Sequence, residues 1–245
     1  MSLRFEDGSR THAGCVRTVN EDACLTRSED ALWAVADGMG GHANGGWASA
    51  QIVAALAAER CPEDIAGAVT AARSALARAN TAIHRMSLAQ RRVIGSTAAM
   101  LVLRARRFAV LWCGDSRVYR LREGVLAALT TDHSQVEQMV ASGLISRDEA
   151  EGHPMAHMLS RAIGVREEAE LDLRMGDVLP GDMFLLCSDG LTRMMREGEI
   201  AQVLMRDTPR RSAQVLVELA LERGASDNVT VVVVGCDETT HVVEP

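Results

Sequence analysis

The chain has 245 residues, of which 47% are apolar and 24% charged, values typical of a globular protein with a substantial buried core. Its net charge of −7 argues against a nucleic-acid partner, because phosphate backbones favour surfaces rich in lysine and arginine. No apolar run approaches the length of a membrane span, and the charged N-terminal segment lacks the apolar region of a signal peptide. We therefore expect no membrane association.

The cysteines indicate a reducing compartment. They are Cys15, Cys24, Cys61, Cys113, Cys187 and Cys236. None belongs to a C-x-x-C pair, which argues against a zinc site. Cys113 and Cys187 lie within apolar runs and are expected to be buried free thiols. We therefore expect a cytoplasmic protein, in which the N-x-T sequence at Asn228 carries no weight as a glycosylation site.

Short apolar runs and longer periodic segments follow one another along the chain. Runs that alternate or are rich in β-branched residues predict strands at 31–36, 96–103, 107–113, 117–121, 183–187 and 229–235. Apolar residues three and four positions apart predict helices at 46–60, 62–86 and 209–224, with a polar helical stretch at 132–151. Pro62, Glu63 and Asp64 suit the first turn of the second helix, and Gly224 suits a C-terminal cap.

These elements do not alternate regularly as strand, helix and strand. Their order favours antiparallel sheets with helices packed outside, which is an α+β architecture. We see no repeat, low-complexity segment or linker, and predict a single domain of residues 1–245.

Acidic residues recur at the ends of the predicted strands. They are Glu21, Asp22, Asp37, Asp115, Asp189 and Asp227. Each aspartate alone is explained by turn chemistry, because Asp bonds nearby backbone groups and a following glycine allows positive φ. If the strands lie in facing sheets, however, the carboxylates converge in one cleft and need cations between them. Oxygen ligands without a cysteine or histidine pair favour Mg²⁺ or Mn²⁺ over Zn²⁺.

Eight blocks of the sequence carry a family resemblance. They are RTVNEDA (17–23), AVADGMGGHANG (34–45), GSTAAMLVL (95–103), CGDSRVYRLR (113–122), LTTDHSQVEQMV (129–140), LSRAIG (159–164), LLCSDGLT (185–192) and SDNVTVVVV (226–234). In this order they resemble the PP2C-type (PPM) metal-dependent protein serine/threonine phosphatases, in their short bacterial stand-alone form. The resemblance implies a four-layer αββα sandwich, with two central antiparallel β-sheets flanked by helices.

The resemblance also implies a metal site. By position, Asp22, Asp37, Asp189 and Asp227 match the ligands of two Mn²⁺ or Mg²⁺ ions, and the backbone carbonyl of Gly38 matches a further ligand. Asp115, together with Asp189, matches the ligands of a third and weaker ion.

Further positions match residues that handle the substrate. Arg17 matches the arginine that binds the substrate phosphate, for which a guanidinium fork is well suited; the alternative is an ordinary surface arginine. Glu21 matches a group that orders metal-bound water. Met39 stands where eukaryotic relatives have a histidine that is a candidate acid for the leaving group. His42 is a candidate replacement, and metal-bound water is the alternative donor.

The implied activity is hydrolysis of phosphoserine and phosphothreonine in proteins. Water activated by the two ions attacks phosphorus in line, while the ions and Arg17 neutralise the phosphoryl oxygens. We expect no covalent phosphoenzyme of the cysteine-phosphatase kind. The expected partners are phosphorylated substrates of a bacterial Ser/Thr kinase, and the expected state is a monomer.

Two alternatives use the same scaffold. One is a non-catalytic regulator that binds phosphoproteins, although the presence of all four matched aspartates favours catalysis. The other is a partner-switching phosphatase with a narrow range of clients, which usually carries a sensor domain.

Residues 132–157 match the variable flap of the family. Their sequence predicts two short helices around Gly143, with Ser146 as an N-cap. Substrate selection and a role as a mobile lid are equally good interpretations. His153 and His157 have the helical i, i+4 spacing but lack the glutamate of H-E-x-x-H, which favours solvated histidines over a metal site.

Overall fold

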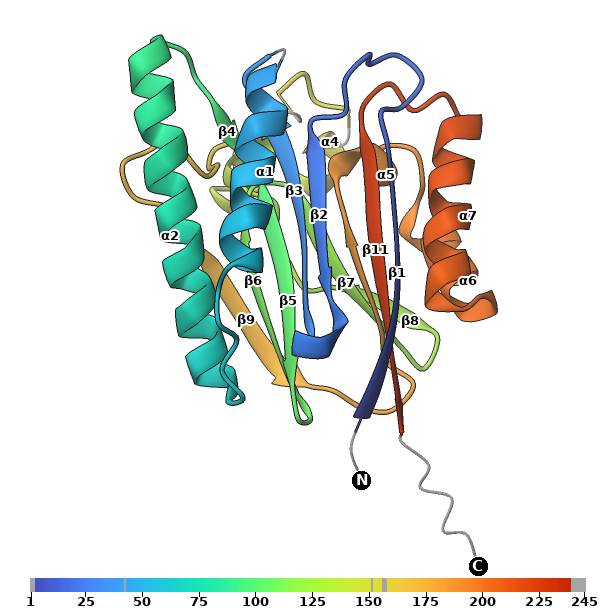
Figure 1. Ribbon diagram of the computed structural model, residues 1–245. Helices are drawn as coiled ribbons and strands as arrows, with labels where there is room; N and C mark the ends of the chain where they lie inside the picture. The colour runs from blue at the N-terminus through green and yellow to red at the C-terminus, as the bar shows by residue number, and fades with distance from the viewer. Residues whose placement is uncertain (1–2, 42, 151, 156–157, 239–245) are drawn as a thin grey trace, which may run out of the picture.

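The computed structural model describes residues 3–41, 43–150, 152–155 and 158–238. Two β-sheets pack face to face, with α1 and α2 covering one sheet and α5, α6 and α7 covering the other (Figure 1). Three buried apolar clusters fill the three interfaces between these four layers. The arrangement confirms the predicted αββα sandwich.

The first sheet contains six strands in the order β2-β3-β5-β6-β9, with β4 paired to β3, and all of its pairs are antiparallel. The strands are β2 (Asp22–Arg27), β3 (Leu32–Met39), β4 (Gly95–Ser96), β5 (Ala98–Arg104), β6 (Arg107–Cys113) and β9 (Asp172–Asp177). Side chains of β3 alternate between two cores: Leu32, Ala34 and Ala36 face α1 and α2. Trp33 and Val35 face the second sheet.

The second sheet contains five strands in the order β1-β11-β10-β7-β8, again antiparallel. The strands are β1 (Leu3–His12), β7 (Arg117–Arg122), β8 (Val125–Ala128), β10 (Met183–Cys187) and β11 (Val229–Glu238). In β11, Val232 and Val234 face the first sheet, whereas Val231 and Val233 face the helices. Burial of both faces explains the unbroken apolar run in this strand.

The helices are α1 (Ala43–Ala57), α2 (Ile65–Gln90), α3 (Gln135–Ala141), α4 (Arg147–Ala150), α5 (Asp189–Thr192), α6 (Glu197–Arg206) and α7 (Pro209–Glu222), and η1 (Ser28–Asp30) is a 3₁₀ turn. α1, α2 and α7 begin and end within a few residues of the predicted positions, and α3 and α4 lie in the predicted polar stretch, whereas α5 and α6 were not predicted. Asp64 caps α2 by accepting a hydrogen bond from Gly67 N at 2.7 Å, so Pro62 and Glu63 precede the helix instead of forming its first turn. After α7 the chain turns at Gly224, where φ is +79°, as predicted.

Four strands were missed by the sequence patterns: β1, β2, β8 and β9. They are the outer strands of the two sheets, at both edges of each. The predicted run at 96–103 is divided into β4 and β5 at Thr97. None of the described helices is long and apolar enough to cross a membrane. All six cysteines are free, and Cys113 and Cys187 are buried as predicted.

Candidate active site

The predicted acidic residues meet where the loops of the two sheets come together. Asp22 and Asp37 face each other across β2 and β3 of the first sheet. Asp189 follows β10 and Asp227 precedes β11 in the second sheet, while Asp115 lies in the link from β6 to β7 that crosses between the sheets. A cavity of about 490 Å³ is lined by Arg17, Glu21, Asp37, Gly38, Asp115, Asp189 and Asp227, among others.

Asp22 lies behind this cavity and connects the two sheets. Its Oδ2 accepts hydrogen bonds from Ser188 Oγ at 2.8 Å and from Thr230 Oγ1 at 2.6 Å. Its buried Oδ1 has no hydrogen-bond partner among the described residues. Burial raises the pKa of Asp22 to about 7, although the two hydroxyl groups oppose this shift. A buried carboxylate oxygen without a partner fits the coordination of a cation.

The neighbouring carboxylates also resist ionisation. Burial raises the pKa of Asp37 well above its usual range, and the charges of Asp22 and Asp189 raise it further. Burial likewise raises the pKa of Asp115 to about 8, with a further contribution from Asp189 and an opposing one from Arg193. Protonation or bound cations would relieve this repulsion, so the donor set fits hard divalent ions.

Two arginines pair with these carboxylates. Asp227 Oδ2 lies 3.1 Å from Arg17 Nη2 and 3.4 Å from Arg193 Nη1. Arg193 forms a second ion pair with Asp189. Within the described part of the chain, no three acidic, histidine or cysteine side chains are grouped tightly enough to hold a metal ion in their present positions. A divalent ion held by Asp189 and Asp227 would compete with these arginines for the two carboxylates.

The glycine-rich loop after Asp37 packs backbone against backbone. A Cβ on Gly38 would overlap the carbonyl group of Gly45, in the first turn of α1. Gly38 N donates to the Glu21 carbonyl at 3.2 Å, and Gly45 N donates to Glu21 Oε1 at 3.1 Å. Gly38 thus has a packing reason to lack a side chain, whereas contact of its carbonyl with an ion stays a prediction. His42, the candidate acid, lies outside the described residues.

Asn228 is a site residue that the sequence patterns did not reveal. Its Oδ1 accepts a hydrogen bond from Glu21 N at 2.7 Å, and its Nδ2 donates to the carbonyl groups of Ala13 and Val19, each at 3.0 Å. Asn228 therefore holds the loop that carries Arg17 against the start of β11. Because this side chain is buried and fully bonded, the N-x-T sequence here is not an accessible glycosylation site.

Cys187 and Arg193 have the C-x5-R spacing of cysteine phosphatases, which runs against the expectation that no covalent phosphoenzyme forms. Cys187 lies in β10 and is fully buried. Burial raises the pKa of its thiol to about 12, so the thiolate needed as a nucleophile does not form near neutral pH. The spacing is therefore a coincidence of sequence.

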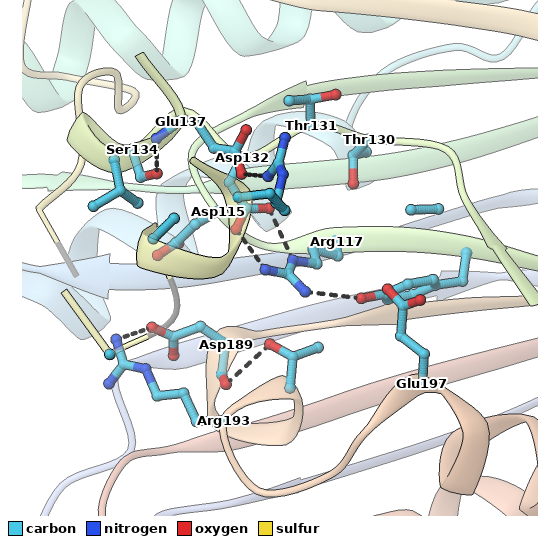
Figure 2. A pocket seen from close by; sticks show the side chains of 17 residues that line it. Asp115, Arg117, Thr130, Thr131, Asp132, Ser134, Glu137, Asp189, Arg193 and Glu197 are labelled. Carbon is cyan, nitrogen blue, oxygen red and sulfur yellow. Dashed lines mark hydrogen bonds and ion pairs between the residues drawn. The ribbon is translucent and has the colours of Figure 1, made fainter. Parts of the chain in front are cut away.

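A second cavity of about 570 Å³ adjoins the first and is lined by residues of the flap (Figure 2). Asp115, Asp189 and Arg193 line both cavities. Within the second cavity, Asp132 binds the Arg117 guanidinium through two hydrogen bonds of 2.9 and 2.8 Å. Its lining is therefore charged and strongly hydrogen-bonded.

The flap itself has the predicted form. α3 and α4 lie on either side of Gly143, whose φ is +73°, and Ser146 Oγ accepts a hydrogen bond from Glu149 N at 3.2 Å. His153 belongs to no helix, and its Nδ1 accepts a hydrogen bond from Met155 N at 3.1 Å. Its predicted i, i+4 partner, His157, lies outside the described residues.

Comparison with known proteins identifies the family. A family model described as protein phosphatase 2C matches residues 12–223. The chain belongs to the protein phosphatase 2C family. The serine/threonine protein phosphatase PstP of Mycobacterium tuberculosis is 38% identical over 236 residues, which cover 95% of this chain but 45% of that protein. The serine/threonine phosphatase Stp of Listeria monocytogenes is 34% identical over 243 residues, covering 94% of this chain and 95% of that protein. The chain thus spans about half the length of its mycobacterial relative.

Solved structures of the phosphatase family have the same fold. PppA of Pseudomonas aeruginosa, described as a key regulatory component of T6SS, has a TM-score of 0.88 and 41% identity, covering 95% of this chain and 97% of that one. The catalytic domain of PstP in complex with two manganese ions has a TM-score of 0.85 and 34% identity, covering 97% of this chain and 100% of that one. The family resemblance seen in the sequence is confirmed.

Proposed function

We propose that the chain is a metal-dependent protein serine/threonine phosphatase that hydrolyses phosphoserine and phosphothreonine in proteins. The observation that carries this proposal is the convergence of buried carboxylates from both sheets, among which Asp22 Oδ1 lacks a hydrogen-bond partner in the described chain. The names of the relatives as serine/threonine phosphatases support the same activity.

The chain's carboxylates would hold two divalent ions, with Mn²⁺ favoured by the two manganese ions of the PstP structure. In our proposal the ligands are Asp22, Asp37, Asp189, Asp227 and the Gly38 carbonyl. Such ions activate water as a nucleophile and stabilise negative charge on phosphoryl oxygens. Ser188 and Thr230 orient Asp22 through its Oδ2, which leaves Oδ1 for an ion.

Arg17 is the group that would bind the substrate phosphate. Its side chain is 56% exposed and lines the cavity, and its guanidinium contacts Asp227. A guanidinium presents paired donors that match phosphate oxygens, so exchange of Asp227 for a phosphate group preserves its bonding. Glu21 orders the loop beside it and is placed to order water in the cavity.

A third ion at Asp115 and Asp189 is a weaker part of the proposal. Arg193 already pairs with Asp189 and lowers the pKa of Asp115, so its fixed positive charge competes with an ion at that position. Met39 has no proton to donate to the leaving alcohol. His42 and water remain the two candidate acids.

The expected substrates are products of a Ser/Thr kinase, and we propose a monomer that works in the cytoplasm. The test is release of inorganic phosphate from phosphoserine and phosphothreonine peptides with Mn²⁺. EDTA and Asp189→Ala should each abolish release, whereas Asp237→Asn, at an exposed position of β11, should retain it. Binding of the peptides without turnover, across several metals, would favour the non-catalytic regulator instead.

A further inference from the structure

The cavity that holds Arg17 and Asp37 has an apolar side as well as a charged one. Met39, Val93, Met158 and Val165 line it, and we refer to these four residues as the apolar wall. Three of these side chains are unusually open for their type: Val93 is 65% exposed, Met158 51% and Val165 38%. Exposed apolar side chains that cluster around one cavity are typical of binding sites, because covering their surface with a ligand removes it from water and is favourable.

One residue of the apolar wall, Met39, lies on the strand that carries Asp37. Met39 follows Asp37 by two positions in β3, so both side chains leave the same face of the strand. Met39 pairs with Gly95 of β4. A Cβ on Gly95 would lie 2.9 Å from Met39 Cε and 3.1 Å from Val165 Cγ2. The absence of a side chain at Gly95 therefore allows Met39 and Val165 to meet over it.

Val93 and Val165 are held in place from both sides of β4. The Val93 carbonyl oxygen lies 3.1 Å from where a Cβ on Gly40 would be, which places Val93 directly against the glycine-rich loop. Ile163, two residues before Val165, exchanges backbone hydrogen bonds of 3.0 and 2.9 Å with Ser96. Met39, Val93 and Val165 are thus anchored at β3, β4 and the glycine-rich loop, whereas Met158 follows the flap, and its carbonyl accepts a hydrogen bond from Gln135 N at 2.8 Å.

We propose that the apolar wall is a substrate subsite, which binds an apolar side chain one or two positions from the phosphorylated residue of the target protein. This inference rests on the proposed phosphatase function. Asp37 and Met39 are two residues apart in the extended strand β3, a span of roughly 7 Å. Two residues of an extended bound peptide span the same distance. A phosphate placed at Arg17 and Asp37 therefore puts a neighbouring peptide residue within reach of the wall.

The surroundings favour this occupant. The wall opens into the same cavity as the charged residues, so a polypeptide that delivers a phosphate group there passes over it. On the far side of Asp115, Asp189 and Arg193, the second cavity is lined by charged and polar groups such as Arg117 and Asp132. One side of the site is therefore apolar and the other is charged. The peptide residues before and after a bound phosphoresidue would meet different surroundings.

Phosphopeptides that differ at one residue test the subsite. The reference peptide has glycine on both sides of phosphothreonine, and its partners carry one leucine at each of the four nearest positions in turn. We expect leucine at one of these positions to raise kcat/KM roughly 10-fold, as for a side chain entering an apolar pocket. Val93→Asn should reduce the ratio of kcat/KM for leucine and glycine peptides to near one.

Val125→Asn is the matched control, because Val125 is 66% exposed in β8, outside both cavities. It should keep the preference for leucine. Equal hydrolysis of all peptides by the native protein would overturn the subsite while leaving the phosphatase function intact. Failure to hydrolyse any peptide would overturn the phosphatase function, and the subsite with it. A preference that survives Val93→Asn and Val165→Asn together would also overturn the subsite.

Discussion

Replacement of Asp22 by asparagine should make the folded protein more stable than the native protein in the absence of metal and less stable than it in the presence of metal. Without metal, folding buries a carboxylate whose pKa rises from 3.8 to about 7. Each pKa unit corresponds to about 1.4 kcal/mol, so the ionised carboxylate costs the folded state about 4 kcal/mol above pH 7. Asparagine has the same shape, carries no charge, and can still accept the hydrogen bonds of Ser188 and Thr230.

The sign of the pH dependence follows from the same shift. Because the pKa is raised in the folded state, the contribution of Asp22 to stability is greatest below about pH 4 and is lost as the pH rises towards 7. In EDTA at pH 8, Asp22→Asn should therefore raise the midpoint of thermal unfolding by roughly 10 °C, whereas at pH 4 the two proteins should unfold at similar temperatures.

In the presence of Mn²⁺, the native protein should be more stable than Asp22→Asn. The native protein should gain stability that rises with the logarithm of the Mn²⁺ concentration above Kd, while Asp22→Asn should gain much less because a proposed ligand has been lost. Thermal unfolding with and without Mn²⁺ measures both effects, and Asp237→Asn, at an exposed position, serves as the charge-matched control. A variant that is less stable than the native protein in EDTA at pH 8, or that keeps the full response to Mn²⁺, would refute the reasoning.

Two further substitutions test the groups around the proposed metal ligands. Arg193→Met should tighten Mn²⁺ binding about fivefold, as measured by calorimetric titration. The reason is that a partly buried ion pair of about 1 kcal/mol no longer holds Asp189 and Asp227. Weaker binding would mean that Arg193 supports the site. Asn228→Ala should lower the free energy of unfolding in urea by about 3 kcal/mol, because three partly buried backbone groups each lose a hydrogen bond of about 1 kcal/mol. The same variant should raise KM for phosphopeptides, since the loop of Arg17 is no longer held, and an unchanged KM would contradict that role.

The central strands could be predicted from the sequence because both of their faces are buried. β3, β5, β6, β10 and β11 each carry an apolar run that lies between a helical layer and the opposite sheet. The missed strands β1, β2, β8 and β9 form the edges, where polar residues are tolerated on solvent-facing positions. β1 illustrates this, because only Gly8 of its ten residues is buried.

Candidate site residues could be predicted from the sequence where the residue type itself is informative. They could not be predicted where their place depends on contacts between distant parts of the chain. Aspartate at strand ends is visible in the sequence, and a family resemblance assigned candidate roles to those positions. The partners of Asp22, Ser188 and Thr230, are 166 and 208 residues away along the chain and become apparent only once the sheets are packed. The pairing of Arg193 with Asp189 and Asp227 is likewise a product of geometry, because the only pattern around Arg193, its C-x5-R spacing from Cys187, does not point to these aspartates.

The division of the acidic residues between two sheets has a consequence for folding intermediates. Asp22 and Asp37 come from one half of the sandwich, and Asp189 and Asp227 from the other. An intermediate with a single formed sheet would hold only half of the charges, and a slip of one sheet over the other by a single residue would separate them. Enzymatic turnover during refolding should therefore appear only with the last step of assembly, when the two halves have docked in register.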